Sequence, residues 1–283
     1  MSGTETCSQK PAAPLAWGHE MNLPVEVVEA VNEGRCVLFV GPTYTGEALE
    51  VAGRDYPDGR ALAKALGWKK PRRMIGARKT VVVPSVTDSA ASYAKQHGRP
   101  ALVARVRGML DASDASPTTA HHTALSRFPM IFTTNYDQML ERTAREMGGE
   151  PTVCYRGEDV PEPDPMKRVI YKLWGGFERS SSLVLTQEDH TEDAFSPDIR
   201  RALRNVIRRN VVFFVGYRPD EEHFERLWQD LTLCYGGELP RCHMAVAQGK
   251  INDYLWQKWV WRGLLMFTAD PIECMEELER QIQ

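Results

Sequence analysis

Residues 128–137 read FPMIFTTNYD, an apolar run that passes directly into a cluster of small and polar residues. The apolar part, Met130 to Phe132, predicts a buried β-strand. Two other runs have the same character, CVLFV at 36–40 and VVFFV at 211–215, and each of them is followed by a glycine. Continuous runs of β-branched and aromatic residues are typical of central parallel strands that helices cover on both faces.

Similar runs, with helical patterns between them, continue along the chain. Strands are expected at Cys36–Val40, Met130–Phe132, Val169–Leu173, Val211–Val215, Met244–Ala247 and Leu264–Phe267. Helices are expected at Val25–Asn32, Arg60–Leu66, Ser89–His97, Leu102–Leu110, Thr118–Arg127, Asp137–Met147, Pro197–Arg209, Glu221–Cys234 and Tyr254–Trp261. The alternation predicts an α/β, doubly wound, Rossmann-like and mostly parallel sheet of about six strands, with helices on both faces.

The length and composition indicate how the chain is divided. Residues 1–22 are rich in Pro, Ala, Ser and Thr without periodicity, so we expect them to form a flexible leader. The remaining residues, 23–283, are enough for one sizeable α/β domain.

Charge and cysteine content narrow the class of protein. The formal net charge of −3 provides no basic field to attract nucleic acid or an anionic membrane. The six cysteines include no Cys-x-x-Cys pair, so no metal site is expected. The chain shows neither a signal-peptide core nor the roughly 18 apolar residues of a membrane span. We therefore expect a cytoplasmic protein without nucleic-acid or membrane partners.

The residues that follow each strand are the candidates for a site, because ligands of doubly wound sheets bind beyond the carboxyl ends of the strands. Residues 41–46, GPTYTG, predict a small-residue turn whose backbone amides could approach a pyrophosphate, although any strand-to-helix turn can carry two glycines. The polar residues 133–137 need partners at a buried strand exit, and a ligand would supply them. The alternative is that Asn135 or Asp137 caps the next helix.

The segment 128–137, followed by QMLE, resembles the strand-plus-TTNYD signature of the sirtuin-like (silent information regulator 2-like) family, in its prokaryotic, zinc-free branch. YKLWG at 171–175 is similar to the family's Lys-Leu-His-Gly, and LTQEDH at 185–190 to its Leu-Thr-x-x-Asp-Tyr. VGYRPD at 215–220 is similar to Gly-Tyr-Ser-x-x-Asp, preceded here by Val. The likeness covers about residues 34 to 278 and implies that residues 23–283 form a sirtuin-like nucleotide-binding domain.

The resemblance implies that NAD or a close relative is the ligand and that its nicotinamide–ribose bond is the reacting bond. It implies catalytic roles for Asn135 and Asp137. The cofactor-binding residues it implies are Gly41, Thr43, Thr45, Thr133, Thr134, Asn135, Asp137, Trp174, Gly175, Gly216, Tyr217 and Asp220. Protein deacetylation is not expected, because the four-cysteine zinc module of deacetylase members is missing from the sequence.

Two departures from the family pattern bear on activity. Trp174 stands where the family has the histidine that serves as general base, and indole has no basic nitrogen to accept a proton. Loss of an acid–base group typically costs about 10²–10⁴ in rate. In the glycine loop, Pro42 lacks an amide donor and Thr43 adds a Cβ where relatives carry glycine.

These departures predict a catalytically impaired or silent NAD-binding module that acts in binding or assembly. The alternative is an NAD hydrolase (NAD glycohydrolase) that releases nicotinamide and ADP-ribose, and the resemblance implies a setting in bacterial antiviral defence for either. His121, His122, His190 and His223 are candidates to replace the base, with His223 preferred. The aromatic segment 255–261 could contact a second protein subunit or another copy of the chain, or could pack in the core.

Overall fold

The computed structural model describes residues 23–51, 53, 56–68, 85–158, 167–190, 195–237, 239, 242–246 and 251–282. The predicted leader, residues 1–22, lies outside the described residues. Among the helices described, none is both long and apolar enough to cross a lipid bilayer.

A seven-stranded, fully parallel sheet forms the centre of the molecule, in the order β3-β4-β2-β1-β5-β6-β7. The strands are β1 (Cys36–Val40), β2 (Met130–Thr133), β3 (Thr152–Tyr155), β4 (Val169–Lys172), β5 (Val211–Val215), β6 (Cys242–Val246) and β7 (Leu264–Thr268). This confirms the doubly wound α/β fold. The sheet has one strand more than the six apolar runs seen in the sequence, because β3 is a four-residue edge strand whose first half is only partly buried.

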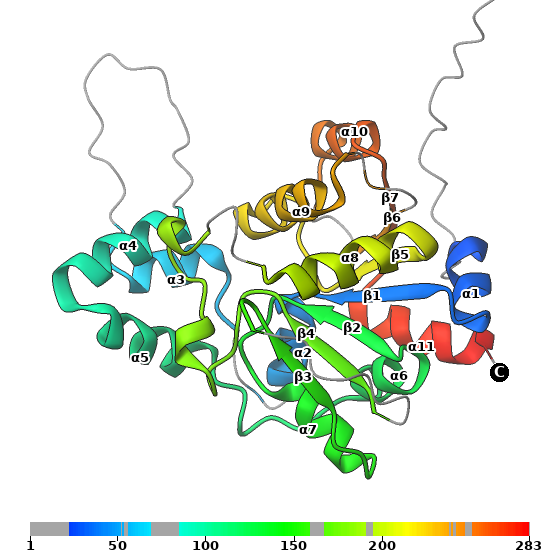
Figure 1. Cartoon of the computed structure of the whole chain (residues 1–283), viewed down its shortest axis with the longest axis horizontal. Helices are drawn as coiled ribbons and strands as arrows, with labels where there is room; N and C mark the ends of the chain where they lie inside the picture. Colours follow the sequence, from blue (N-terminus) through cyan, green and yellow to red (C-terminus); the bar gives the residue numbers. More distant parts are fainter. Residues whose placement is uncertain are drawn as a thin grey trace, which may run out of the picture.

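Helices cover both faces of the sheet (Figure 1). They are α1 (Val25–Asn32), α2 (Pro42–Val51), α3 (Gly59–Ala65), α4 (Val86–His97), α5 (Arg99–Leu110), α6 (Thr119–Arg127), α7 (Met139–Glu146), α8 (Pro197–Arg209), α9 (Glu222–Tyr235), α10 (Asp253–Trp261) and α11 (Pro271–Ile282), with short 3₁₀ turns η1 (Ser180–Ser182) and η2 (Gln187–Asp189). Helix α11 was not predicted. The expected turn at 41–46 is instead the start of α2, since Pro42 occupies a first-turn position that needs no amide hydrogen.

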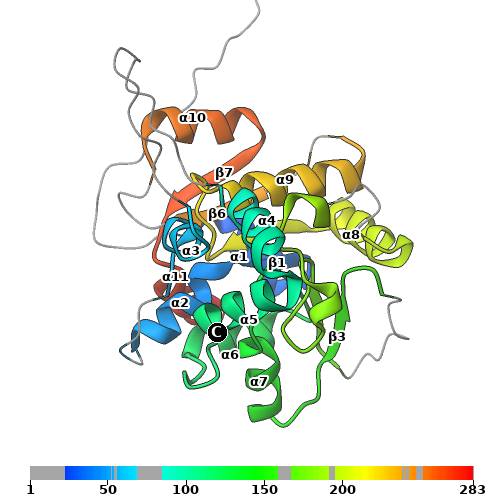
Figure 2. The same cartoon turned by 90° about the vertical axis from the view of Figure 1, so that its left-hand side faces the viewer.

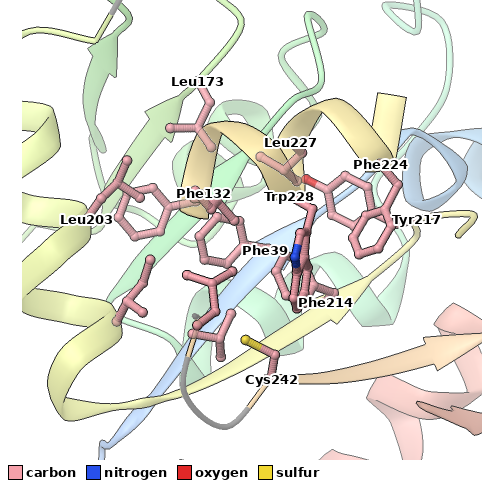
Figure 3. Close-up of a cluster of buried hydrophobic side chains, with 14 of the residues drawn as sticks. Phe39, Phe132, Leu173, Leu203, Phe214, Tyr217, Phe224, Leu227, Trp228 and Cys242 are labelled. Carbon is pink, nitrogen blue, oxygen red and sulfur yellow. The ribbon is translucent and has the colours of Figure 1, made fainter. Parts of the chain in front are cut away.

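The two faces of the sheet follow from alternation along each strand. On β1, Val37 and Phe39 point to the side covered by α8, α9 and α10, whereas Leu38 and Val40 point to the side covered by α1, α6, α7 and α11. Figure 3 shows Phe39 beside Phe132 and Phe214, with ring centroids 5.0 Å apart in both pairs. Each ring buried in this way contributes about 1.5–3 kcal/mol to stability.

Helices α3, α4 and α5 form a separate layer, here called the helical cap, with its own apolar cluster (Figure 2). Leu62, Ala90 and Val106 meet there, together with side chains from residues 177–185. Arg99 ties α5 to that segment through bonds to the Leu183 carbonyl, 2.6 Å, and to Asp189, 2.7 Å. The cap therefore shares its core with the loop that follows β4.

Candidate functional site

The turns that follow β1 and β5 are locked together by backbone hydrogen bonds. The amide of Gly41 donates to the Val215 carbonyl at 2.9 Å, and the amide of Thr43 donates to the Gly216 carbonyl at 3.0 Å. A Cβ at Gly41 would lie 2.4 Å from the Gly216 carbonyl oxygen, so glycine is required for this close approach. Both amides are already used within the protein, and in this arrangement they do not face a phosphate.

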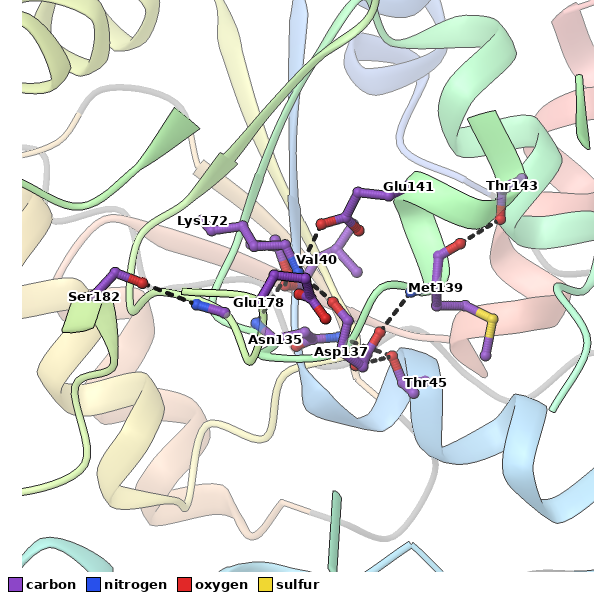
Figure 4. Close-up of polar contacts among 12 residues, drawn as sticks. Val40, Thr45, Asn135, Asp137, Met139, Glu141, Thr143, Lys172, Glu178 and Ser182 are labelled. Atoms are coloured by element: carbon purple, nitrogen blue, oxygen red, sulfur yellow. Dashed lines mark hydrogen bonds and ion pairs between the residues drawn. The ribbon is translucent and has the colours of Figure 1, made fainter. Parts of the chain in front are cut away.

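Asn135 lies beside the turn that follows β1 (Figure 4). Its side-chain Nδ2 donates to the Gly41 carbonyl at 3.1 Å and to Thr45 Oγ1 at 3.0 Å. Its backbone amide donates to the Thr133 hydroxyl, which itself donates to the Val40 carbonyl at 2.9 Å. The remaining atom, Asn135 Oδ1, is buried and has no hydrogen-bond partner within the described part of the chain. A buried carbonyl oxygen of this kind is costly unless a ligand or water completes it.

Asp137 has a supporting position. Its Oδ2 accepts a hydrogen bond from Thr45 at 3.0 Å, and its Oδ1 accepts one from the amide of Met139 at 2.9 Å. The second bond satisfies the first amide of α7 from one residue before its N-cap, Gln138, whose own side chain makes no capping bond. Asp137 thereby connects α2, β2 and α7, and both of its oxygens are engaged.

A fully buried ion pair supports the segment that follows β2. Lys172 Nζ on β4 lies 2.9 Å from Glu141 Oε1 on α7 and donates to the Asp137 carbonyl (Figure 4). Burial alone would lower the pKa of Lys172, but the carboxylates of Glu141 and Asp137 outweigh it and raise that pKa. Lys172 therefore stays charged, and it supports the backbone that carries Asn135.

A cavity of about 370 Å³ opens beyond the carboxyl ends of the strands and reaches the helical cap. Five of the residues named from the sequence line it: Thr43, Thr134, Asn135, Trp174 and Tyr217. The other seven do not: Gly41, Thr45, Thr133, Asp137, Gly175, Gly216 and Asp220. The structure thus brings the segments after β1, β2, β4 and β5 to one cavity, while several of the named residues lie one layer behind it.

The residues behind the cavity have identifiable structural roles. Gly175 has φ +82°, and a Cβ there would lie 2.3 Å from the Ser182 carbonyl oxygen. Asp220 pairs with Arg218 at 3.0 Å, and it is Arg218 that faces the cavity. These positions keep the surrounding turns in place.

Trp174 is flanked in the cavity by two histidines. The ring centroids of Trp174 and His190 are 5.4 Å apart in an edge-on arrangement, and those of Trp174 and His223 are 5.5 Å apart. All three side chains line the cavity, and Trp174 Nε1 is buried without a hydrogen-bond partner. One indole and two imidazoles therefore lie side by side in the cavity wall. Within the described residues, no group of three His, Cys, Asp or Glu side chains could hold a metal ion.

A family model described as a SIR2-like domain matches residues 129–261. This range is a little under half of the chain, and it is similar to a SIR2-like domain. The matched range runs from β2 to α10 and so includes Asn135, Trp174, His190 and Tyr217, while β1 and α2 precede it.

Two proteins called NAD(+) hydrolase ThsA are similar to the chain. The one from Enterococcus faecium is 25% identical over 209 residues, which cover 72% of this chain and 41% of the relative. The one from Cytobacillus dafuensis is 24% identical over 222 residues, which cover 75% of this chain and 41% of the relative. The chain therefore matches about two fifths of the length of these relatives.

Sequence reasoning missed two parts of the wall of this cavity. One is the apolar contribution of the helical cap through Leu62, Ala90 and Val106, which carries no signal beyond helical periodicity. The other is Glu221, a single acidic residue at a helix start. Burial raises the pKa of Glu221 to about 7, although Arg218, 3.5 Å away, opposes the shift. Its protonation therefore changes near neutral pH.

Proposed function

We propose that the cavity binds NAD and that the chain hydrolyses the nicotinamide–ribose bond. The observation that carries this proposal is Asn135 Oδ1, a buried acceptor without a partner on a residue that lines a cavity of about 370 Å³. A ribose hydroxyl or a carboxamide N–H of NAD would donate to it. Cavities of about 300–1,000 Å³ with a few converging polar groups are typical ligand sites.

The proposed reaction breaks one bond of NAD and forms one bond to water. The carbon–nitrogen bond to nicotinamide breaks, its electron pair neutralises the pyridinium, and a water oxygen bonds to the ribose carbon. Asn135 would position ribose or water, while Thr134 and Tyr217 would add polar contacts at the strand ends. A proton must leave the attacking water, and Trp174 cannot accept it.

A silent binding module is the second candidate, and Trp174 is the observation that favours it. This residue is 2% exposed and occupies the position that the resemblance assigns to the base. The two imidazoles beside it, from His190 and His223, make hydrolysis the function that the site supports better.

The two candidates are separated by measuring nicotinamide release together with thermal stability. We expect the wild-type chain to release nicotinamide from NAD and to be stabilised by it. Asn135→Ala should abolish release and weaken NAD-dependent stabilisation. Asn210→Ala, which removes an amide that only bonds the Val206 carbonyl at the end of α8, is the matched control and should behave as wild type. Stabilisation by NAD without nicotinamide release would support the silent module. If NAD caused neither release nor stabilisation, both candidates would be refuted.

We also propose that the activity serves bacterial antiviral defence in association with a second subunit or another copy of the chain. Helix α10 would supply the contact, because Trp261 and Tyr254 are 87% and 77% exposed while Trp259 is in the core. Light scattering of the wild type and of Trp261→Ser, with and without NAD, tests this contact. Protection of cells against phage that is lost with Asn135→Ala tests the defence role.

A further inference from the structure

We infer that His190, oriented by Asp230, is the group that accepts the proton of the attacking water, in place of the base that Trp174 replaces. The inference rests on the proposed function. His190 directly follows η2 and lines the cavity together with Asn135. Asp230 lies on α9, on the sheet face covered by α8 and α9.

The two side chains form a buried pair. His190 Nδ1 lies 3.7 Å from Asp230 Oδ2, and the side chains are 4% and 15% exposed. Both atoms are buried, and neither has another hydrogen-bond partner among the residues that the structure describes. A proton on Nδ1 facing the carboxylate leaves the lone pair on Nε2, which is the form that a general base requires. The distance is longer than a hydrogen bond, as catalytic contacts often are before substrate binds.

Hydrogen bonds anchor the segment that leads into His190. Asp189 accepts hydrogen bonds from the amides of Leu185 and Thr186, at 2.7 and 2.8 Å, and from Arg99 of the helical cap at 2.7 Å. The amide of Val184 donates to the Trp174 carbonyl at 3.0 Å, which fixes the start of the segment beside the indole. His190 is therefore positioned before substrate arrives, as an efficient base must be.

His223 is the competing imidazole, and its surroundings differ. It contacts the same indole and lines the same cavity. Burial lowers the pKa of His223, and His190 lowers it further, which outweighs the opposing effect of Glu222. A base of lower pKa drives proton transfer less well. The Nδ1 atom of His190 faces the Asp230 carboxylate, which orients the ring, so we assign the step to His190.

The proposed step is balanced in atoms and charge. Water bonds to the ribose carbon as the bond to nicotinamide breaks, and one water proton passes to Nε2 of His190. Asp230 stabilises the resulting imidazolium and does not itself take the proton. The proton then leaves to solvent, so that NAD and water give nicotinamide, ADP-ribose and one proton.

Steady-state kinetics of nicotinamide release test the assignment. We expect His190→Gln to lower kcat by about 10²–10⁴ while KM and NAD-dependent stabilisation stay near wild type. Imidazole added to His190→Ala should restore part of the rate. Asp230→Asn should lower kcat with little change in KM, and His223→Gln should cost less than His190→Gln. His97→Gln, at an exposed side chain in the last turn of α4 and not among the residues that line the cavity, is the matched control.

The ring tautomer provides a readout that does not depend on turnover. Nitrogen NMR of histidine-labelled protein should show His190 protonated on Nδ1, and Asp230→Asn should shift the proton toward Nε2. Full kcat in His190→Gln, a larger loss in His223→Gln, or an Nε2–H tautomer in the wild type would each overturn the inference. Absence of release from the wild type would instead overturn the proposed hydrolysis, and the tautomer alone would then decide whether the pair exists.

Discussion

Gly216 and Gly236 both have a positive φ angle but very different surroundings. Their φ angles are +77° and +84°. A Cβ at Gly216 would lie 2.8 Å from Tyr44 Cβ, whereas a Cβ at Gly236, which ends α9, would meet nothing within 4 Å. Alanine should therefore have a conformational cost at each of the two sites, and a steric cost only at Gly216.

Gly236→Ala should lower the free energy of unfolding by about 1–2 kcal/mol, the cost of a left-handed residue. Gly216→Ala should add a further penalty of about 1–3 kcal/mol, because either Tyr44 or the β1 and β5 turns must shift. Urea denaturation of the two variants measures the difference directly. Equal losses in the free energy of unfolding would show that the contact between the turns after β1 and β5 tolerates a side chain at position 216.

Glu221 should make stability depend on pH near neutrality. Its pKa is raised from 4.5 to about 7 by burial, so between these values the folded chain holds a proton that the unfolded chain has released. The free energy of unfolding should therefore fall as pH rises through this window, by roughly 2–3 kcal/mol at most, relative to Glu221→Gln. Urea denaturation of both proteins at pH 5 and pH 7.5 tests this, and parallel pH curves would contradict it.

At the scale of elements, the ion pair of Lys172 and Glu141 joins β4 to α7 in the interior, with side-chain exposures of 1% and 4%. A buried charge without its partner is far more costly than the pair or than two apolar side chains. The position of the segment after β2 thus depends on both elements.

Lys172→Met should lower the free energy of unfolding by about 3–5 kcal/mol, because Glu141 would be left buried and unpaired. The double variant with Glu141→Leu should recover much of that loss. Thermal and urea denaturation of the wild type, both single variants and the double variant give the coupling energy. Additive losses would show that the two charges do not depend on each other.

In the whole molecule, the cavity lies between the parallel sheet and the helical cap. Its floor is the set of strand ends, and part of its wall is the helical cap, which shares an apolar cluster with residues 177–185. A ligand that fills the cavity would contact both, so its binding energy would also hold the cap in place.

NAD at about 100 times its Kd should stabilise the folded chain by about 2.7 kcal/mol. If the ligand contacts the cap, amide hydrogen exchange should slow in α3, α4 and α5 as well as in the turns after β1, β2 and β5. Mass-detected exchange with and without NAD tests this. Protection confined to the sheet would show that the cap takes no part in binding.

The sequence alone determined the buried strands, the parallel class of the sheet and the polar residues after β2, because burial on both faces requires local apolar runs that are visible within a few residues. It left out β3, whose four residues are too short and too exposed to show such a run.

Only the tertiary structure decided which of these residues share the cavity and which support it. Asn135 and Thr45 are 90 residues apart and hydrogen-bonded, while His190 meets Asp230 from a different element. Contacts of this kind depend on how helices and strands pack, and nothing in the local pattern around either residue encodes its distance to the other. The polar residues could therefore be predicted from the sequence. Which of them line the cavity and which support it from behind could not.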